Sequence, residues 1–235
     1  MNDIYKLQLG LTGEFDCSYL PDRQEQLLVV HPQAQMNSDT YQQLLPRGFR
    51  RGGEDAYRPH CTNCNACQSI RIAVSEFVPT KSQRRILSKN KDVELRTRST
   101  PSPDYFPLYA RYIAHRHASG SMYPPKEETL ASFTQCSWLD RVFIEGYLDG
   151  KLVSVAVCDS VSDALSAVYT FFEPSLDKRS LGQFNILQQI KLAKQQHKKY
   201  LYLGYQIDEC DAMNYKKNYG PNERFIEEQW IKFKK

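Results

Sequence analysis

The elements predicted between residues 141 and 204 constrain the fold more than any other feature of the sequence. Two strand-like segments, residues 141–148 and 151–157, flank Asp149-Gly150, a dipeptide that favours a tight hairpin because both residues tolerate positive φ. A third strand is followed by a glycine-containing loop, a helix and a short strand, over residues 164–172, 179–182, 183–198 and 200–204. This order predicts a mixed sheet layered with helices, and hence an α+β fold.

A cluster of Ser, Thr and Pro over residues 97–104 marks the predicted boundary between two domains. Before it, apolar patterning predicts strands at residues 24–31, 70–74 and 93–95 and helices at residues 38–45 and 80–90. Ser38 or Asp39 is expected to cap the first helix, and Arg71 to lie on a half-polar strand face. After the boundary, we predict helices at residues 105–117 and 127–136 and a long final strand at residues 223–233. Residues 1–98 should therefore form a small Cys-rich α/β domain, and residues 99–235 a larger one.

Composition points to a folded protein in a reducing compartment. Hydrophobic residues make up 41% and aromatic residues 12% of the chain, which is typical of globular proteins. The first residues lack the basic and apolar regions of a signal peptide, and no apolar run approaches the roughly 18 residues of a membrane span. We therefore expect a cytoplasmic protein, in which the seven cysteines serve as thiols or metal ligands and not as disulfides.

Three cysteines, Cys61, Cys64 and Cys67, form a C-x2-C-x2-C run. This spacing lets thiolates converge on one ion, and a tetrahedral site needs a fourth ligand. Cys17 is the first candidate for that ligand, and His60 is the local alternative. Zinc and an iron–sulfur cluster both suit such ligands, while a tight turn with buried thiols is the structural alternative.

A basic segment follows the cysteines. Lys81, Arg84 and Arg85 share one face of the helix predicted at residues 80–90, and Lys89 lies one turn further on. Such a face binds phosphates without reading sequence, and its affinity weakens with salt. An ordinary solvated helix face is the alternative.

The loop Arg179-Ser180-Leu181-Gly182 lies between a predicted strand and a predicted helix, an arrangement that points N–H groups at an anion. It matches neither the P-loop nor the dinucleotide-binding fingerprint. It resembles instead the phosphate-gripping loop of the GNAT-type N-acyltransferases, except that Phe184 stands where those enzymes usually carry a small residue.

Several longer motifs together resemble the arginyl-tRNA–protein transferase family, in its bacterial branch of aspartate/glutamate leucyltransferases. In the first half these motifs are Cys17-Ser18-Tyr19-Leu20-Pro21, Tyr57-Arg58-Pro59, Arg71 and SQRRILSKN. In the second half they are Ser180-Leu181-Gly182, Tyr202-Leu203-Gly204-Tyr205, Met213-Asn214-Tyr215-Lys216, Tyr219 and Pro221. Leu20 stands where a second cysteine of an N-terminal pair would be expected, so any cluster must depend on Cys61, Cys64 and Cys67.

The resemblance implies a GNAT-like catalytic domain that transfers leucine from leucyl-tRNA to proteins beginning with Asp or Glu and so marks them for degradation by the N-end rule. Compact length and the cysteine run favour leucine over arginine as the donor residue. No cofactor is required for the chemistry, and neither a membrane nor DNA is an expected partner. The alternatives are an arginyl-tRNA–protein transferase, an acetyl-CoA N-acetyltransferase and a non-enzymatic zinc module that binds RNA.

Direct aminolysis of the aminoacyl ester needs alignment of the two reactants and an unprotonated amine. An acidic acceptor calls for a cation, for which the candidates are Arg71, Arg84 and Lys216. Candidates for the proton relay are Tyr205, Tyr169 and Asp208. The tRNA phosphates are expected to contact the loop and the basic helix, through Arg179, Ser180, Leu181, Gly182, Lys81, Arg85 and Lys89.

Overall fold

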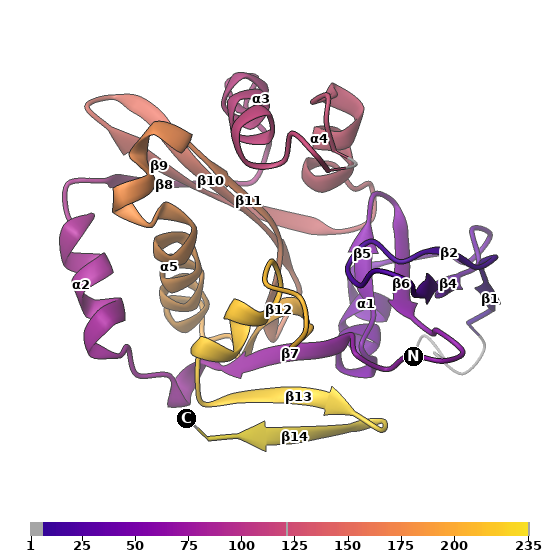
Figure 1. The fold of residues 1–235 in the computed structure, drawn as a ribbon. Helices are drawn as coiled ribbons and strands as arrows, with labels where there is room; N and C mark the ends of the chain where they lie inside the picture. The colour runs from indigo at the N-terminus through magenta and orange to yellow at the C-terminus, as the bar shows by residue number, and fades with distance from the viewer. Residues whose placement is uncertain (1–6, 121, 235) are drawn as a thin grey trace.

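The computed structural model describes residues 7–120 and 122–234, and one large mixed sheet dominates it (Figure 1). In spatial order its strands are β14 (Gln229–Phe233), β13 (Asn222–Ile226), β7 (Gln68–Ala73), β12 (Tyr200–Gln206), β11 (Ala164–Phe172), β10 (Lys151–Ser160), β9 (Asp140–Leu148) and β8 (Glu94–Arg98). Neighbouring strands run antiparallel, except that β11 and β12 are parallel. The predicted α+β class and the Asp149-Gly150 hairpin are confirmed, with φ of 49° and 75° at the two turn residues.

Helices cover both faces of this sheet (Figure 1). On one face lie α3 (Tyr105–Arg116) and α4 (Glu127–Thr134), and on the other lies α5 (Leu181–Gln195), against which α2 (Lys81–Lys89) packs. The adjacent residues Phe171 and Phe172 point to opposite faces, because side chains alternate along a strand. Phe171 joins the core under α3 and α4, and Phe172 joins the core under α5. None of the described helices combines the length and the apolarity that a membrane span requires.

A smaller sheet of four strands packs beside the large one (Figure 1). Its order is β1 (Leu9–Leu11), β4 (Leu27–Val30), β6 (Asp55–Pro59) and β5 (Arg50–Gly52). The same part of the chain holds the short pair β2 (Phe15–Asp16) and β3 (Gln24–Glu25) and helix α1 (Ser38–Leu44). One hydrophobic cluster joins both parts, since Tyr41 and Leu44 from α1 pack with Ala164 and Tyr202 of the large sheet.

The large sheet spans the predicted domain boundary. Strands β7 and β8 and helix α2 precede residue 99, yet they belong to the large sheet and its helical layer. The division into residues 1–98 and 99–235 stays a prediction. Four short 3-10 segments complete the described structure: η2 (Leu45–Arg47), η3 (Val74–Glu76), η4 (Pro174–Arg179) and η5 (Asn214–Asn218).

Two local predictions were wrong. The long final strand is a hairpin of β13 and β14, because Glu227 and Glu228 adopt left-handed φ of 48° and 60° and reverse the chain. Asn37, not Ser38 or Asp39, caps α1, since its side chain accepts a hydrogen bond from the Thr40 N–H at 2.9 Å.

Candidate functional site

The two parallel strands of the large sheet, β11 and β12, separate from each other in the middle of the sheet. β11 and β12 pair over only three residues each, and the last pair is Ser166 with Tyr202. Just beyond, β12 carries one residue more than β7 between Tyr202 and Tyr205, and Gly204 there has a φ of 85°. This is a β-bulge, a feature that redirects a strand and is frequent beside active sites. We call the point where β11 and β12 separate the branch point.

The loop before α5 is tied to the end of α2. Arg179 makes a two-pronged ion pair with Asp92 at 2.8 and 2.9 Å, and its carbonyl accepts from Asn90 Nδ2 at 2.9 Å. Lys89 Nζ reaches the carbonyl of Lys178 at 2.8 Å. The structure therefore brings Lys89 to the glycine loop, whereas Lys81 lies roughly 12 Å away at the other end of α2, given the rise of a helix.

The N-terminus of α5 is shaped by its flanking residues. Ser180 adopts a left-handed φ of 55° and makes no side-chain cap to the helix. Leu181 is fully buried, and a Cβ at Gly182 would lie 3.2 Å from the Phe172 ring. The backbone N–H groups of the first helical turn are the groups of this loop that favour an anion.

The basic face of α2 is open to solvent. Its cations Lys81, Arg84, Arg85 and Lys89 are exposed, while Ile86 and Leu87 pack against the core of α5. Arg84 donates to the carbonyl of Pro79 at 2.6 Å. The four charges form one solvent-facing surface, as the spacing predicts.

Arg71 is enclosed by partners. Its side chain pairs with Glu223 at 2.7 Å and lies between the rings of Tyr200 and Trp230, at 3.9 and 4.0 Å from their centroids. The predicted alternation is confirmed, because Ile70, Ile72 and Val74 share one core cluster while Arg71 has polar partners. Since β7 is a central strand, this polar side chain is nevertheless only 9% exposed.

Lys216 in η5 is buried, with 5% of the residue exposed. Its Nζ donates to the carbonyl of Tyr205 at 2.8 Å and contacts Met213 Sδ at 3.1 Å. Burial, with a further contribution from the charge of Arg50, lowers the pKa of Lys216 to about 7. No carboxylate pairs with it among the residues that the structure describes.

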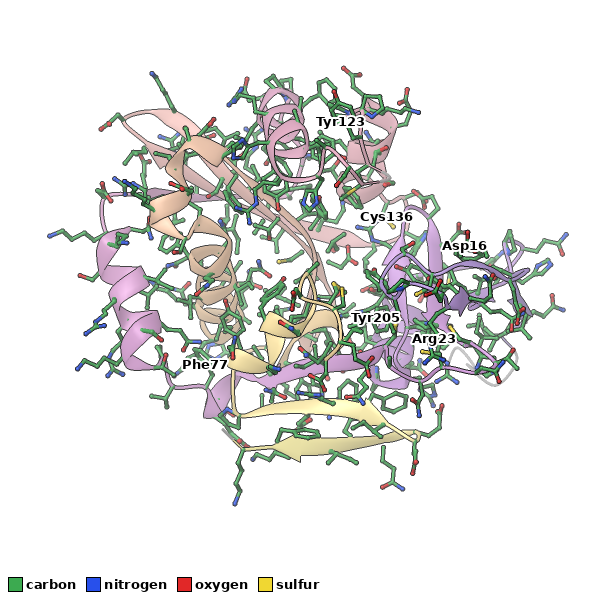
Figure 2. The ribbon with its side chains drawn as sticks, viewed as in Figure 1. Asp16, Arg23, Phe77, Tyr123, Cys136 and Tyr205 are labelled. Atoms are coloured by element: carbon green, nitrogen blue, oxygen red, sulfur yellow. The ribbon has the colours of Figure 1, made fainter. Side chains whose placement is uncertain are left out.

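The predicted relay residues lie apart from one another in the hydrogen-bond network of the described chain. Tyr205 lies between the large sheet and the smaller one (Figure 2), where its hydroxyl donates to the carbonyl of Gly48 at 3.0 Å. Tyr169 stacks on Phe133 at 4.4 Å. Burial raises the pKa of both tyrosines well above the ordinary value.

Asp208 lies on the exposed segment after β12. It accepts from Arg224 at 2.7 Å and from Gln206 at 2.8 Å. Partial burial acts to raise the pKa of Asp208, but these hydrogen bonds outweigh it and leave the pKa below the ordinary value. A carboxylate of this kind is ionised at neutral pH.

The four cysteines predicted as metal ligands line one pocket of about 250 Å³, together with His60 and Tyr205. Burial, followed by the charges of Cys17, Cys61 and Cys64, raises the pKa of the Cys67 thiol to about 12. Their side-chain positions do not form a metal-binding arrangement, since no group of three or more His, Cys, Asp or Glu does so within the described ranges. The donor set nevertheless has the chemistry that zinc and iron–sulfur clusters prefer.

Arg50, a buried cation at the branch point, was not among the site residues predicted from the sequence. Arg50 is 5% exposed, and Nη1 donates to Ser166 Oγ at 3.0 Å. Its Nε and Nη2 find no partner in the described structure. Adjacent arginines at positions 50 and 51 carry no local signal that tells their roles apart.

The whole chain has close relatives. It matches "Arginine-tRNA-protein transferase, N terminus" over residues 15–85 and "Arginine-tRNA-protein transferase, C terminus" over residues 104–226. It is 51% identical to an aspartate/glutamate leucyltransferase from Pseudoalteromonas atlantica, covering 95% of this chain and 96% of that one. A protein of the same name from Aeromonas hydrophila is 48% identical, with 98% and 97% covered.

Solved structures are more distant. The C-terminal domain (DUF2156) of a putative lysylphosphatidylglycerol synthetase from Agrobacterium fabrum aligns with a TM-score of 0.45 and 12% identity, over 74% of this chain and 53% of that one. The assignment therefore depends on the sequence relatives. Family matches to both halves, and relatives of one name along nearly the full length, lead to one conclusion: the chain belongs to the arginine-tRNA-protein transferase family, among the aspartate/glutamate leucyltransferases.

Proposed function

We propose that this protein transfers leucine from leucyl-tRNA to the N-terminal Asp or Glu of acceptor proteins. The observation that carries the proposal is 51% identity over 224 residues with an aspartate/glutamate leucyltransferase. Transfer in the cytoplasm, as a step of degradation by the N-end rule, is part of the same proposal.

The catalytic part is proposed to be GNAT-like. Its supports are the β9–β10 hairpin, the parallel pair β11–β12 that separates after Ser166, and α5, whose N-terminus follows a loop between these strands. The proposal places an extended ligand at the branch point, where the pairing of the two strands ends. A helix N-terminus nearby favours a phosphate.

The reaction is proposed to be direct aminolysis. The free α-amino group of the acceptor attacks the ester carbonyl of leucyl-tRNA, a C–N bond forms, and the ester C–O bond to the 3′-terminal ribose breaks. The amine loses a proton and the ribose oxygen gains one. Because the ester is already activated, the protein supplies mainly alignment, and Tyr205, Tyr169 and Asp208 remain the proposed relay candidates. Asp208 is the ionised group among them.

The test of this function is a transfer assay on the purified protein. It would receive tRNA charged with labelled leucine, arginine or phenylalanine, and peptides that begin with Asp, Glu, Arg or Ala. Leucine on the Asp and Glu peptides alone is the expected result. Arginine transfer would keep the family and overturn the donor, whereas acetyl-CoA turnover or RNA binding without transfer would support another activity.

The exposed face of α2 is proposed to hold tRNA phosphates together with the loop before α5. Charge reversal by Lys81→Glu, Arg85→Glu and Lys89→Glu should raise KM for leucyl-tRNA and reduce the salt slope of binding by roughly three, about one per contact. The control is reversal of Lys191, Lys194 and Lys199, exposed cations near the other end of α5. Equal effects of the two triple variants would contradict a specific tRNA face.

A structural metal is proposed at Cys17, Cys61, Cys64 and Cys67, which would join the smaller sheet to the start of β7. No step of the reaction passes through it. Metal analysis of the purified protein should find zinc or iron, and Cys64→Ser should lose it because zinc and cluster sites need their full thiolate set. Cys210→Ser, outside the run, should keep the metal, and a metal-free native protein would refute the proposal.

A further inference from the structure

Arg50 is a buried cation that lacks a counter-ion. Its Nε and Nη2 have no hydrogen-bond partner in the described structure, and its only side-chain hydrogen bond runs from Nη1 to the neutral Ser166. An uncompensated buried charge is unfavourable for the folded state. We therefore expect the Arg50 guanidinium to bind an anionic group of another molecule.

The neighbouring residue on the same strand shows the opposite arrangement. Arg51 pairs with Asp159 at 2.8 Å and also donates to several backbone carbonyls. Asp159 is close enough to Arg50 for the two charges to interact. Its two oxygens, however, already accept hydrogen bonds from Arg51 and Tyr41. Arg51 is satisfied within the fold, and Arg50 is not.

Lys216 is a second buried basic side chain, and it lies close enough to Arg50 for the Arg50 charge to lower its pKa. Its Nζ contacts a carbonyl and a thioether, neither of which carries a charge. The ion pairs formed by described residues, with N–O distances of at most 4.0 Å, include neither Arg50 nor Lys216. The environment of Arg50 therefore has an excess of positive charge.

The Arg50 guanidinium lies at the branch point. It bonds Ser166, in the last pair before β11 and β12 separate, and sits 5.4 Å from the centroid of the Tyr202 ring. Its Nη2 lies 3.9 Å from the position that a Cβ would take at Gly204. A ligand between the separating strands would thus have its end near this guanidinium.

We infer that Arg50, with Lys216 beside it, binds the side-chain carboxylate of the acceptor's first residue, an inference that rests on the proposed leucyl transfer. The N–H groups of Nε and Nη2 lie along one edge of the guanidinium, which is a geometry that binds both oxygens of a carboxylate. A neutral amide in place of the carboxylate would leave the Arg50 charge uncompensated, so the site rejects Asn and Gln.

A tRNA phosphate is the alternative anion that Arg50 could bind. Phosphate contacts that position a nucleic acid come mainly from surface cations, and α2 provides such cations. Arg50 and Lys216 are both about 95% buried, at 5% exposure each. A compact side-chain carboxylate matches this depth better than a polymer backbone does.

The experiment compares leucine transfer to two peptides that differ only in an Asp or Asn first residue. Arg50→Met should reduce the Asp-to-Asn ratio of kcat/KM by roughly 100-fold or more, because the charge-matched contact is lost, with KM for leucyl-tRNA unchanged. Arg47→Met is the matched control, since Arg47 is an exposed arginine just before β5. Arg71→Met and Arg84→Met test the two other candidate cations.

Thermal stability and peptide binding distinguish the loss of a carboxylate contact from the misfolding of the variant. Arg50→Met should match or exceed the thermal stability of the wild type, because it removes an unpaired buried cation. A fluorescent Asp peptide, without tRNA, should bind the wild type and lose affinity for Arg50→Met, and an Asn peptide should bind neither.

The outcomes separate the inference from the function. No leucine transfer by the wild type would refute the proposed function. The binding of the Asp and Asn peptides would still show whether Arg50 binds a carboxylate. An unchanged Asp-to-Asn ratio in Arg50→Met overturns the inference, and loss of the ratio in Arg71→Met or Arg84→Met would assign the site to that residue instead. A raised KM for leucyl-tRNA at an unchanged ratio would assign Arg50 to a phosphate.

Discussion

Arg51→Met is expected to lower the free energy of unfolding by about 3–5 kcal/mol, the cost of leaving one partner of a buried ion pair behind. The side chains of Arg51 and Asp159 are 0% and 1% exposed. Removing the guanidinium leaves the Asp159 carboxylate with Tyr41 as its one side-chain hydrogen-bond donor among the described residues. It also removes a donor from the carbonyls of Gly53, Ser132, Phe133 and Gln135, although Ser132 keeps the Gly53 N–H at 3.1 Å.

The effect should be large because these contacts join separate parts of the fold. Arg51 lies on β5 of the smaller sheet, Asp159 on β10 of the large sheet, and the carbonyls of Ser132 and Phe133 at the end of α4. One side chain therefore ties three elements whose mutual packing depends on it. Urea unfolding followed by circular dichroism measures the loss.

Two variants test the explanation. Arg50→Met, one residue away and equally buried, should cost little or stabilise the protein, since its charge has no partner to lose. Arg51→Met combined with Asp159→Leu should recover part of the loss, because both charges leave the interior together. Equal destabilisation by Arg50→Met and Arg51→Met would show that burial of an arginine, and not its pairing, sets the cost.

Lys216→Met is expected to remove a pH dependence of stability. In the folded protein, burial first and the Arg50 charge second lower the pKa of Lys216 from 10.5 to about 7. Between these two values the unfolded chain binds more protons than the folded protein, so the free energy of unfolding rises with pH. The rise approaches ~1.4 kcal/mol per pH unit for one group, and it is absent below the folded pKa, where both states are protonated.

The measurement is urea unfolding of wild type and variant at pH 7, 8 and 9. The advantage of the wild type over Lys216→Met should grow by roughly 2 kcal/mol across this range. The charged and titratable groups that act on Lys216 are Arg50, Cys67 and Cys210, and they remain in the variant. Lys217→Met is the control, since the side chain of Lys217 is 47% exposed and pairs only loosely with Asp208 at 3.9 Å. Parallel pH curves for wild type and Lys216→Met would refute the lowered pKa.

Local signals in the sequence predicted many of the elements well. The Asp149-Gly150 turn, the strand at residues 164–172 and helix α2 all follow from side chains within a few positions of one another. The hairpin of β13 and β14 was missed for a local reason as well. Its turn residues are Glu227 and Glu228, whereas Asn or Gly normally marks a tight hairpin. The metal, the relay residues and the domain boundary stay predictions.

The sequence by itself determined the alternation of strands and helices, the basic face of α2 and the family motifs, because each depends on spacing along the chain. Only the tertiary structure decided which charges are satisfied. Arg51 meets Asp159 across 108 positions, Arg71 meets Glu223 across 152, and Arg50 reaches Ser166 across 116 without finding a carboxylate. The physical reason is that the cost of a buried charge depends on partners from distant strands, which packing selects and no local pattern encodes.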